Sequence, residues 1–190
     1  MALNTNCIVL AAGASQRFGQ PKMLASLADG TPMLLATLAK YQAVFDEVTV
    51  VVRLDSHLQA LLDKNGVKLV HSPKADQGMS QSLIVGVQAN INADACLIAL
   101  GDMPYIKTDT IERLCGMASS TNICMPIHQG NNGNPVIFGK DFYSDLLKIR
   151  GDQGAKRITQ QYANKLQGLE VDDQGVLHDI DIPAQILPMQ

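Results

Sequence analysis

The chain has 190 residues, of which 46% are hydrophobic, 17% charged and 4% aromatic, and its formal net charge is −3. A chain of this length and hydrophobicity can bury a sizeable core in one domain spanning residues 1–190, so a disordered or fibrous protein is excluded. The slight acidic balance argues against a nucleic-acid partner, because such proteins need a basic face to neutralise phosphates.

The chain carries no pattern typical of export or of a membrane protein. No apolar stretch approaches the roughly 20 residues that a membrane span needs, and the N-terminal residues lack the basic and apolar segments of a secretory signal. The four cysteines are scattered without a CxxC pair, which favours free thiols over disulfides or a zinc site. We therefore expect a reduced, cytoplasmic protein without a membrane partner.

Short apolar runs alternate with longer segments of helical period along the chain. Strands are predicted at 7–12, 47–52, 67–70, 95–100, 123–125 and 135–138, and helices at 32–44, 56–64, 80–90, 108–118, 141–149 and 153–162. For the first helix, Thr31 is the expected N-cap and Pro32 the first helical residue. Continuous apolar runs indicate strands that are covered on both faces. The pattern predicts an α/β fold, a three-layer α/β/α sandwich with a mostly parallel sheet.

In such sheets ligands bind outside the carboxyl ends of the strands, so the loops that follow the predicted strands are the candidate sites. The loop after the first strand contains Gly13, Arg17, Gly19 and Lys22. Small residues let backbone N–H groups approach an anion, and the two cations can neutralise phosphates. Neither GxxxxGK[ST] nor GxGxxG is present. An ordinary glycine-containing turn with surface cations is the alternative.

Carboxylates mark two further segments. Asp102 follows the predicted strand 95–100, where a carboxylate can bind Mg²⁺ together with phosphate oxygens; an aspartate that caps a helix or closes a turn is the alternative. All five charged residues after Lys165 are acidic, and among them Asp179 and Asp181 occupy alternate positions. In an extended chain alternate side chains share one face and could point at one cation. A solvated acidic tail is the other interpretation.

Three segments carry weaker signals. Ser80 or Ser82 could cap the helix predicted at 80–90, or the start of that helix could bind an anion or a base. Asn134 lies in a Gly-Asn-Pro turn before a strand, and the segment 151–157 places glycines and cations beside a helix start. Each of these segments also has a purely structural interpretation.

The combination is more specific than any one segment. LAAGxSxRxGxPK, GMSxSLxxG, LGDMP, GNPVxF, GDxGA and DIDxP occur in this order over nearly the whole chain. Together they resemble the MobA-like nucleotidyltransferases, and most closely the MocA-type branch, the molybdenum cofactor cytidylyltransferases. The chain departs from the family pattern at Phe18, where Met is usual, and at 182–185, where Ile-Pro-Ala-Gln replaces Thr-Pro-Glu-Asp. The second change loses two acids, which predicts weakened or altered use of that end of the site.

The resemblance implies a Rossmann-like sandwich that transfers a nucleoside monophosphate from a nucleoside triphosphate with the help of Mg²⁺. The resemblance implies catalytic roles for Arg17, Lys22 and Asp102, and metal ligation by Asp102 and Asp181. The implied nucleotide contacts are Leu10, Ala11, Ala12, Gly13, Lys22, Gly78, Ser80, Ser82 and Asp102. The implied acceptor contacts are Asn134, Gly151, Asp152 and Gly154.

CTP is the expected nucleotide, because Ala12 replaces a glycine of the guanylyltransferase branch and narrows the pocket toward a pyrimidine. The expected acceptor is a phosphorylated pterin such as molybdopterin, which the enzyme would hand to a molybdoenzyme or a chaperone. Three alternatives stay open: a guanylyltransferase, a sugar-phosphate nucleotidyltransferase, and a nucleotide-binding module without turnover.

Overall fold

The computed structural model describes residues 3–13, 18, 21–53, 56–151 and 154–186. Its strands are β1 (Thr5–Leu10), β2 (Val48–Val52), β3 (Lys68–His71), β4 (Ala95–Leu100), β5 (Ile123–His128), β6 (Asn131–Asn132), β7 (Val136–Gly139) and β8 (Leu166–Glu170). Its α-helices are α1 (Met33–Gln42), α2 (Ser56–Leu62), α3 (Met79–Ala89), α4 (Thr108–Met117), α5 (Tyr143–Leu146) and α6 (Lys156–Gln161). Short 3₁₀ helices cover Lys22–Leu24, Ala75–Gln77, Lys140–Phe142, Ala163–Lys165, Gln174–Leu177 and Pro183–Gln185.

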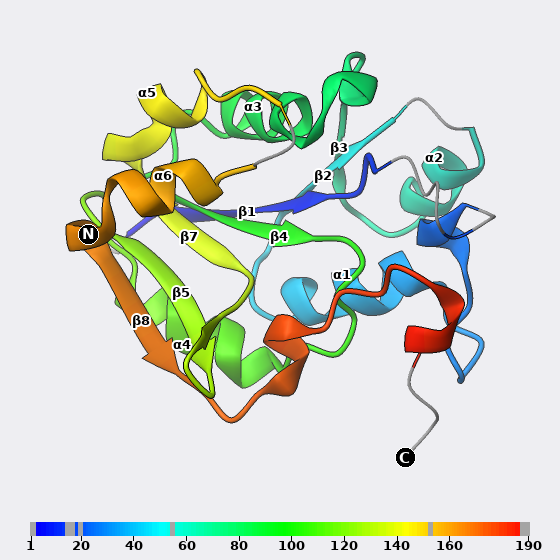
Figure 1. Ribbon diagram of the computed structural model, residues 1–190. Helices are drawn as coiled ribbons and strands as arrows, with labels where there is room; N and C mark the ends of the chain where they lie inside the picture. Colours follow the sequence, from blue (N-terminus) through cyan, green and yellow to red (C-terminus); the bar gives the residue numbers. More distant parts are fainter. Residues whose placement is uncertain (1–2, 14–17, 19–20, 54–55, 152–153, 187–190) are drawn as a thin grey trace.

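The strands form one sheet in the order β3-β2-β1-β4-β7-β5-β6, and β8 pairs with β5. β1 pairs in parallel with β2 and β4, and β2 pairs in parallel with β3. β7 runs antiparallel between β4 and β5. The predicted α/β fold with a mostly parallel sheet is therefore confirmed. The carboxyl ends of β1, β2, β3 and β4 meet at one edge of the sheet, toward which the C-terminal segment also returns (Figure 1).

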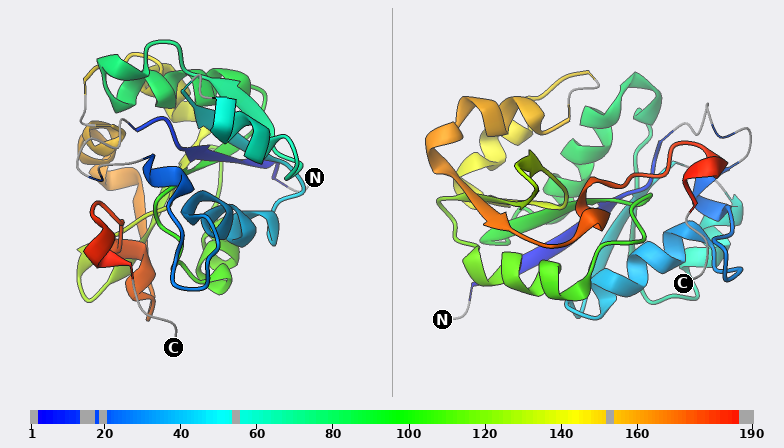
Figure 2. Two further views of the ribbon diagram at one scale, coloured as in Figure 1. Left: turned by 90° about the vertical axis from the view of Figure 1, so that its right-hand side faces the viewer. Right: turned by 60° about the horizontal axis from the view of Figure 1, so that its bottom comes forward.

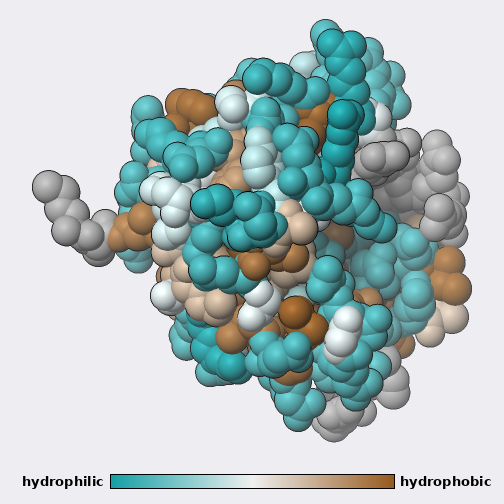
Figure 3. All heavy atoms as spheres, turned by 60° about the vertical axis from the view of Figure 1, so that its left-hand side comes forward, coloured by the Kyte–Doolittle hydropathy of each residue, from teal (hydrophilic) through white to brown (hydrophobic). Residues whose placement is uncertain are grey.

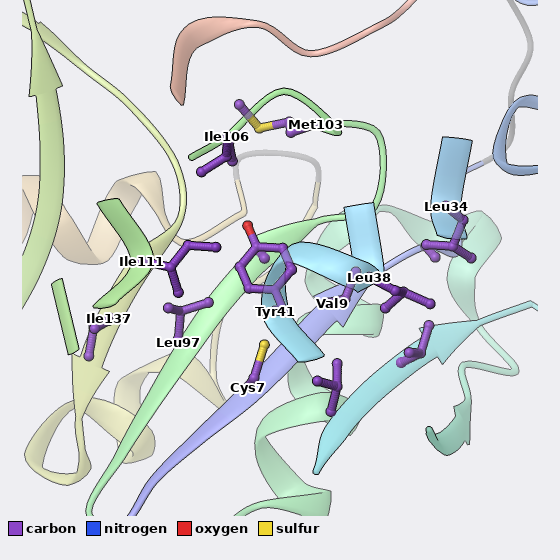
Figure 4. Packing of buried hydrophobic residues seen from close by; sticks show 14 of the residues in the cluster. Cys7, Val9, Leu34, Leu38, Tyr41, Leu97, Met103, Ile106, Ile111 and Ile137 are labelled. Carbon is purple, nitrogen blue, oxygen red and sulfur yellow. The ribbon is translucent and has the colours of Figure 1, made fainter. Parts of the chain in front are cut away.

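Helices cover both faces of the sheet and complete the three layers. α1 and α4 lie against one face, whereas α3, α5 and α6 lie against the other (Figures 1 and 2). Alternate residues of β1 divide between the two faces: Cys7 and Val9 pack in the cluster that contains Leu38 of α1 (Figure 4), and Ile8 packs in the cluster that contains Leu83 of α3. Because each buried aliphatic side chain contributes roughly 1.5–3 kcal/mol, burial on both faces accounts for the continuous apolar run in this strand.

The first helix begins differently from the prediction. α1 starts at Met33 with Pro32 as its N-cap residue and without a side-chain cap, so the prediction of Thr31 as N-cap is wrong. Thr31 instead belongs to the preceding turn, in which its N–H donates to Asp29 Oδ1 at 2.9 Å and its carbonyl accepts from the Leu27 N–H at 2.9 Å. The hydrogen bond from the Thr31 N–H to the Asp29 carboxylate places Thr31 in this turn.

Elements in the second half of the chain also differ from the predicted bounds. A 3₁₀ turn precedes α5 within the helix predicted at 141–149, and α6 is shorter than the predicted 153–162. β6 and β8 are not predicted at all. β8 lacks an apolar run, since Gln167, Gly168 and Glu170 are exposed, and it forms through parallel pairing with β5. A Cβ at Gly168 would collide with the side chain of Ile127, which would have to shift to admit any other residue.

The surface shows few large apolar side chains. On the face in Figure 3, hydrophilic residues predominate and the hydrophobic ones lie in small separate groups. The exposed large apolar residues among those described are Leu3, Met79, Ile91, Leu177 and Ile182. None of the helices in the described ranges combines the length and the apolar character that crossing a membrane requires.

Candidate active site

A cavity of about 520 Å³ opens at the carboxyl ends of β1, β2 and β4. Because parallel strands end at the same edge of the sheet, loops that are far apart in the sequence meet at this point. The cavity is lined by Leu10, Ala12, Gly13, Phe18, Lys22, Met23, Arg53, Ala75, Asp76, Gly78, Met79, Ser82, Leu100, Asp102, Asp179 and Asp181. It therefore unites residues from the predicted first loop, the start of α3, the loop after β4 and the acidic segment.

Lys22 joins the loop after β4 to the acidic segment. Its Nζ lies 2.7 Å from Asp102 Oδ2 and 2.9 Å from Asp181 Oδ1. Lys22 is only 7% exposed, and burial by itself would lower the pKa of its ammonium group. The two carboxylates outweigh burial, so the pKa of Lys22 is raised and the side chain stays charged. The two predicted metal-ligating carboxylates are thus held together around one cation.

Asp102 occupies a rigidly held loop. Directly after β4, the N–H of Gly101 donates to the Leu10 carbonyl at 2.9 Å, and the Gly101 carbonyl accepts from Thr37 Oγ1 of α1 at 3.0 Å. Burial raises the pKa of the Asp102 carboxyl, against the opposing effect of Lys22, and the charge of Asp179 raises it further. Burial and Asp179 thus destabilise the ionised form of Asp102, and a cation bound to this carboxylate would stabilise that form.

The acidic segment points its carboxylates at the cavity because the residue between them points away. Ile180 is fully buried and packs against Phe18 and Met33, and its N–H donates to the Asp102 carbonyl at 3.0 Å. Since neighbouring side chains of an extended chain point to opposite sides, Asp179 and Asp181 face the cavity. This part of the acidic tail therefore lines the cavity.

Gln185 stabilises the turn that follows Asp181. Its Oε1 accepts from the backbone N–H groups of Asp181 at 2.6 Å and of Ile182 at 2.9 Å. The family pattern has an acid at this position, and the chain uses an amide oxygen there to fix the backbone next to the carboxylate of Asp181. The departure from the family pattern thus has a structural role in this protein.

The donor set around Asp102 fits a divalent cation. Asp102 Oδ1 is buried and makes no hydrogen bond with any described residue, which leaves a carboxylate oxygen without a partner. No group of three or more His, Cys, Asp or Glu side chains within the described ranges is arranged to hold a metal ion. Asp102 with either Asp181 or Asp179 from the same cavity suits Mg²⁺, because this ion usually takes one or two carboxylates and completes its shell with water and phosphate oxygens.

The first loop is described in part. Leu10, Ala12 and Gly13 line the cavity, whereas Ala11 is 3% exposed and faces a smaller hollow of about 70 Å³. Arg17, the predicted phosphate ligand, lies outside the described residues.

The two candidate serines at the start of α3, Ser80 and Ser82, have different surroundings. Gly78 precedes the helix with φ 109°, a left-handed conformation that glycine adopts without strain. Ser82 lines the cavity, and its Oγ donates to Ser72 Oγ at 3.4 Å. Ser80 is fully buried and does not line the cavity. Its N–H donates to the Gly151 carbonyl at 3.2 Å, so this residue links α3 to the predicted acceptor loop.

A second cavity of about 560 Å³ lies beside the first. Its walls are mostly apolar, with amides and one lysine among them: Leu10, Met79, Leu83, Ile98, Leu100, Met125, Asn132, Gly133, Asn134, Val136, Phe138, Gly154, Ala155, Lys156, Thr159 and Gln160. The predicted acceptor residues Asn134 and Gly154 are among them, Gly151 is not, and Asp152 lies outside the described residues. Three residues line both cavities, which therefore share a wall: Leu10, Met79 and Leu100.

The Gly-Asn-Pro turn positions Asn134 by close packing. The N–H of Asn134 donates to the Val176 carbonyl at 2.9 Å. A Cβ at Gly133 would lie 2.7 Å from both Val176 Cγ2 and the Val176 carbonyl oxygen, a separation too short for any side chain. Glycine is therefore required for this turn to reach the second cavity.

Two charged residues of the first cavity were not predicted to belong to a site. Arg53 directly follows β2, and Asp76 lies in the 3₁₀ helix before α3. The same signal that points to Asp102, a charged residue immediately after a buried strand, also applies to Arg53. Asp76 carries no such signal, because four residues separate it from the end of β3.

Comparisons with known proteins agree with this geometry. The family model for the MobA-like NTP transferase domain matches residues 7–166. The molybdenum cofactor cytidylyltransferase of Escherichia coli (strain K12) is 25% identical over 189 residues, which cover 96% of this chain and 93% of that protein.

Solved structures give the same result. The crystal structure of Rv0371c from Mycobacterium tuberculosis H37Rv superposes with a TM-score of 0.82 at 26% sequence identity, covering 97% of this chain and 96% of that one. The crystal structure of the same protein in complex with manganese superposes with a TM-score of 0.70 at 25% identity, covering 90% of this chain and 89% of that one.

Proposed function

The chain belongs to the family of MobA-like NTP transferase domains, and from this premise we propose that it transfers CMP from CTP to a phosphorylated acceptor and releases pyrophosphate. The observation that carries the proposal is the Lys22 ammonium held between Asp102 and Asp181 in a cavity that adjoins a second one. The charged residues of the first cavity can bind a triphosphate and its cation, and the adjoining second cavity can hold the acceptor.

The chemical problem is the approach of two anions. A phosphate oxygen of the acceptor forms a bond to the α-phosphorus of CTP, and the bond from that phosphorus to the oxygen bridging the β-phosphate breaks, so pyrophosphate leaves with the electron pair. Lys22 binds and neutralises phosphate oxygens in this exchange, because its raised pKa keeps it charged. No general base is required, since a phosphate monoester has its second pKa near ~6 and is largely ionised at neutral pH.

Mg²⁺ is the proposed cofactor, and Asp102 and Asp181 are the residues that would hold it. When bound, the ion supplies positive charge that stabilises the entering and leaving oxygens. Support comes from the partnerless Asp102 Oδ1 and from the related Rv0371C, whose structure was solved as a complex with manganese. The chain's own part is to orient both carboxylates, through the buried Ile180 and the hydrogen bonds of Gln185.

The proposed acceptor is a phosphorylated pterin of the molybdopterin type. The similarity to the E. coli molybdenum cofactor cytidylyltransferase supports it, and so do the apolar walls of the second cavity. A fused ring system can pack against the accessible apolar residues Met79, Leu100 and Val136, while Asn134 and Lys156 can hydrogen-bond its polar edge and its charged groups.

The test is a panel of reactions with the purified protein. Each of CTP, GTP, ATP and UTP is incubated with Mg²⁺ and molybdopterin, and with a hexose 1-phosphate in place of molybdopterin, and both pyrophosphate and the nucleotide adduct are quantified by chromatography. We expect an adduct only with CTP and molybdopterin. An adduct formed with GTP and not CTP, an adduct formed with the sugar phosphate alone, or nucleotide binding without any product would each contradict the proposal.

A further inference from the structure

Lys22 holds the two carboxylates to which the proposed cation would bind. Its Nζ lies 2.7 Å from Asp102 Oδ2 and 2.9 Å from Asp181 Oδ1. We propose that this ammonium is an internal competitor of the divalent cation. It keeps the cation weakly bound while no nucleotide is present, and it leaves both carboxylates when a triphosphate supplies phosphate oxygens for it. The inference rests on the proposed function, because it takes Asp102 and Asp181 as the residues that would hold Mg²⁺.

The two carboxylates are brought together by backbone hydrogen bonds as well as by Lys22. The N–H of Asp181 donates to Gln185 Oε1 at 2.6 Å, and the N–H of its neighbour Ile180 donates to the Asp102 carbonyl at 3.0 Å. The acidic segment is thus tied both to its own turn and to the loop after β4. The fold therefore provides a preformed pair of carboxylates, and repulsion between them is relieved by whichever cation lies between them.

The side chain of Lys22 is the partner that can move. Lys22 begins the 3₁₀ helix Lys22–Leu24, and its backbone carbonyl accepts from the Ala25 N–H at 3.1 Å. The ammonium is carried on a flexible four-carbon stem with rotatable donors, so it can exchange one anion for another while the backbone stays in place. Lys22 also lines the first cavity, where the triphosphate is proposed to bind. The same ammonium can therefore serve the carboxylates first and the phosphates later.

The ammonium and a divalent cation exclude each other at these oxygens. Mg²⁺ binds carboxylate oxygens at about 2.0–2.1 Å, so an ion bound to Asp102 Oδ2 and Asp181 Oδ1 would take the place of the ammonium or touch it. Asp102 Oδ1 makes no hydrogen bond with any described residue, but an ion held there would lie beside a positive charge. Because the Lys22 and Asp102 side chains are largely buried, that repulsion is weakly screened. A triphosphate removes the conflict, because it supplies anionic oxygens to the lysine and to the ion together.

The experiment measures metal binding without nucleotide, by titration with Mn²⁺, which prefers the same oxygen ligands and whose free ion is quantified by electron paramagnetic resonance. We expect K22M to bind Mn²⁺ at least about 10-fold more tightly than the wild type, because the competitor is lost and both carboxylates remain. K22R keeps a cation between the carboxylates and should bind Mn²⁺ as weakly as the wild type. R53Q is the matched control, since it removes one positive charge from the same cavity at a side chain whose Nε donates to the Ala12 carbonyl. Its Mn²⁺ affinity should change less than about 3-fold.

Two further measurements locate the ion and follow the lysine. The double variant K22M/D102N should lose the gain in Mn²⁺ affinity, because the ion binds at Asp102. In wild-type protein labelled with ¹⁵N-lysine, the side-chain resonance that is missing from K22M belongs to Lys22. This resonance should shift when Mg²⁺ and the α,β-methylene analogue of CTP are added together, and stay unchanged with the same concentration of Mg²⁺ alone. If thermal unfolding shows that K22M does not fold, K22Q, whose amide can still donate to a carboxylate, replaces it and must show the same gain.

Unchanged or weaker Mn²⁺ binding in the lysine variant would overturn the inference, because the ion would then bind Asp102 Oδ1 and Asp179 with Lys22 still in place. A gain as large in R53Q as in K22M, a gain that persists in K22M/D102N, or a Lys22 resonance that the nucleotide analogue does not shift would overturn it as well. Tighter Mn²⁺ binding in K22M of a protein that transfers no CMP would contradict the proposed function and leave this inference standing. CMP transfer with unchanged Mn²⁺ binding in K22M would contradict this inference alone.

Discussion

The two cavities at the edge of the sheet are nearly equal in volume but opposite in chemistry. The first, of about 520 Å³, is lined by two cations, Lys22 and Arg53, and by four aspartates. In the second, of about 560 Å³, Lys156 is the single charged residue among the described lining residues, and apolar residues such as Met79, Leu100 and Val136 predominate. A triphosphate with its cation needs the charged lining of the first cavity, and the ring system of an acceptor needs the mostly apolar lining of the second.

Their shared wall shows how one fold can supply both surfaces. Leu10 and Leu100 end two neighbouring parallel strands, and Met79 begins α3. The charged residues follow these strands in the loops, whereas the apolar residues of the second cavity belong largely to β4, β7 and α3. Because loops tolerate charge and the packed elements do not, the difference between the cavities follows from where their linings lie along the chain.

Removing a carboxylate from the first cavity should have the largest effect. D102N keeps the shape of the side chain but removes the charge that faces Lys22, so we expect the rate of CMP transfer to fall at least about 100-fold. The Kd for CTP in the presence of Mg²⁺ should rise as well. The exposed variant D141N serves as the control for the loss of one negative charge. A rate of CMP transfer for D102N within a few fold of the wild-type rate would contradict the claim that the charged residues of the first cavity act on the triphosphate.

Filling the second cavity should act on the acceptor alone. Ala155 is half-buried in its wall, and A155L would reduce the space available to a ring. We expect the KM for the acceptor to rise about 10-fold, because lost packing of this size is worth about 1–3 kcal/mol, while the Kd for CTP stays unchanged. A155S is the matched control of similar size. A comparable loss of CTP affinity in A155L would show that the two cavities do not bind separate substrates.

The smallest effect concerns stability at high pH. The pKa of Lys22 is raised above 10.5 in the folded protein, so its ion pairs stabilise the folded state fully below that value and lose this effect as the pH rises through the raised pKa. In urea unfolding between about pH 8 and about pH 11.5, the difference in free energy of unfolding between the wild type and K22M should shrink with rising pH. A difference that grows would contradict the pairing of Lys22 with Asp102 and Asp181.

The sequence predicts well those features that rest on long buried runs. β4 has the predicted bounds, and β1 and β2 lie within one or two residues of them, because strands covered on both faces require uninterrupted aliphatic residues. Asp102 could be placed at the site because it directly follows such a run. The carboxylates of Asp179 and Asp181 could also be placed, since the alternation of side chains in an extended chain decides which residues share a face.

Features that depend on tertiary contacts escape sequence reasoning. β8 exists only by pairing with β5, and its exposed residues give no strand pattern. Ser80 and Ser82 look equivalent in the sequence, and both are buried, but the packing of α3 places only Ser82 in the lining of the cavity. Arg53 could have been found by applying to β2 the rule that identified Asp102. Asp76 required the structure itself.

A crystal structure with Mg²⁺ and the α,β-methylene analogue of CTP, which cannot release pyrophosphate, tests the division of labour between the cavities most directly. We expect the triphosphate against Lys22, Asp102 and Asp181, the cytosine ring elsewhere in the first cavity, and the second cavity left open for the acceptor. A cytosine ring bound in the second cavity, or a triphosphate away from Lys22, would contradict this expectation.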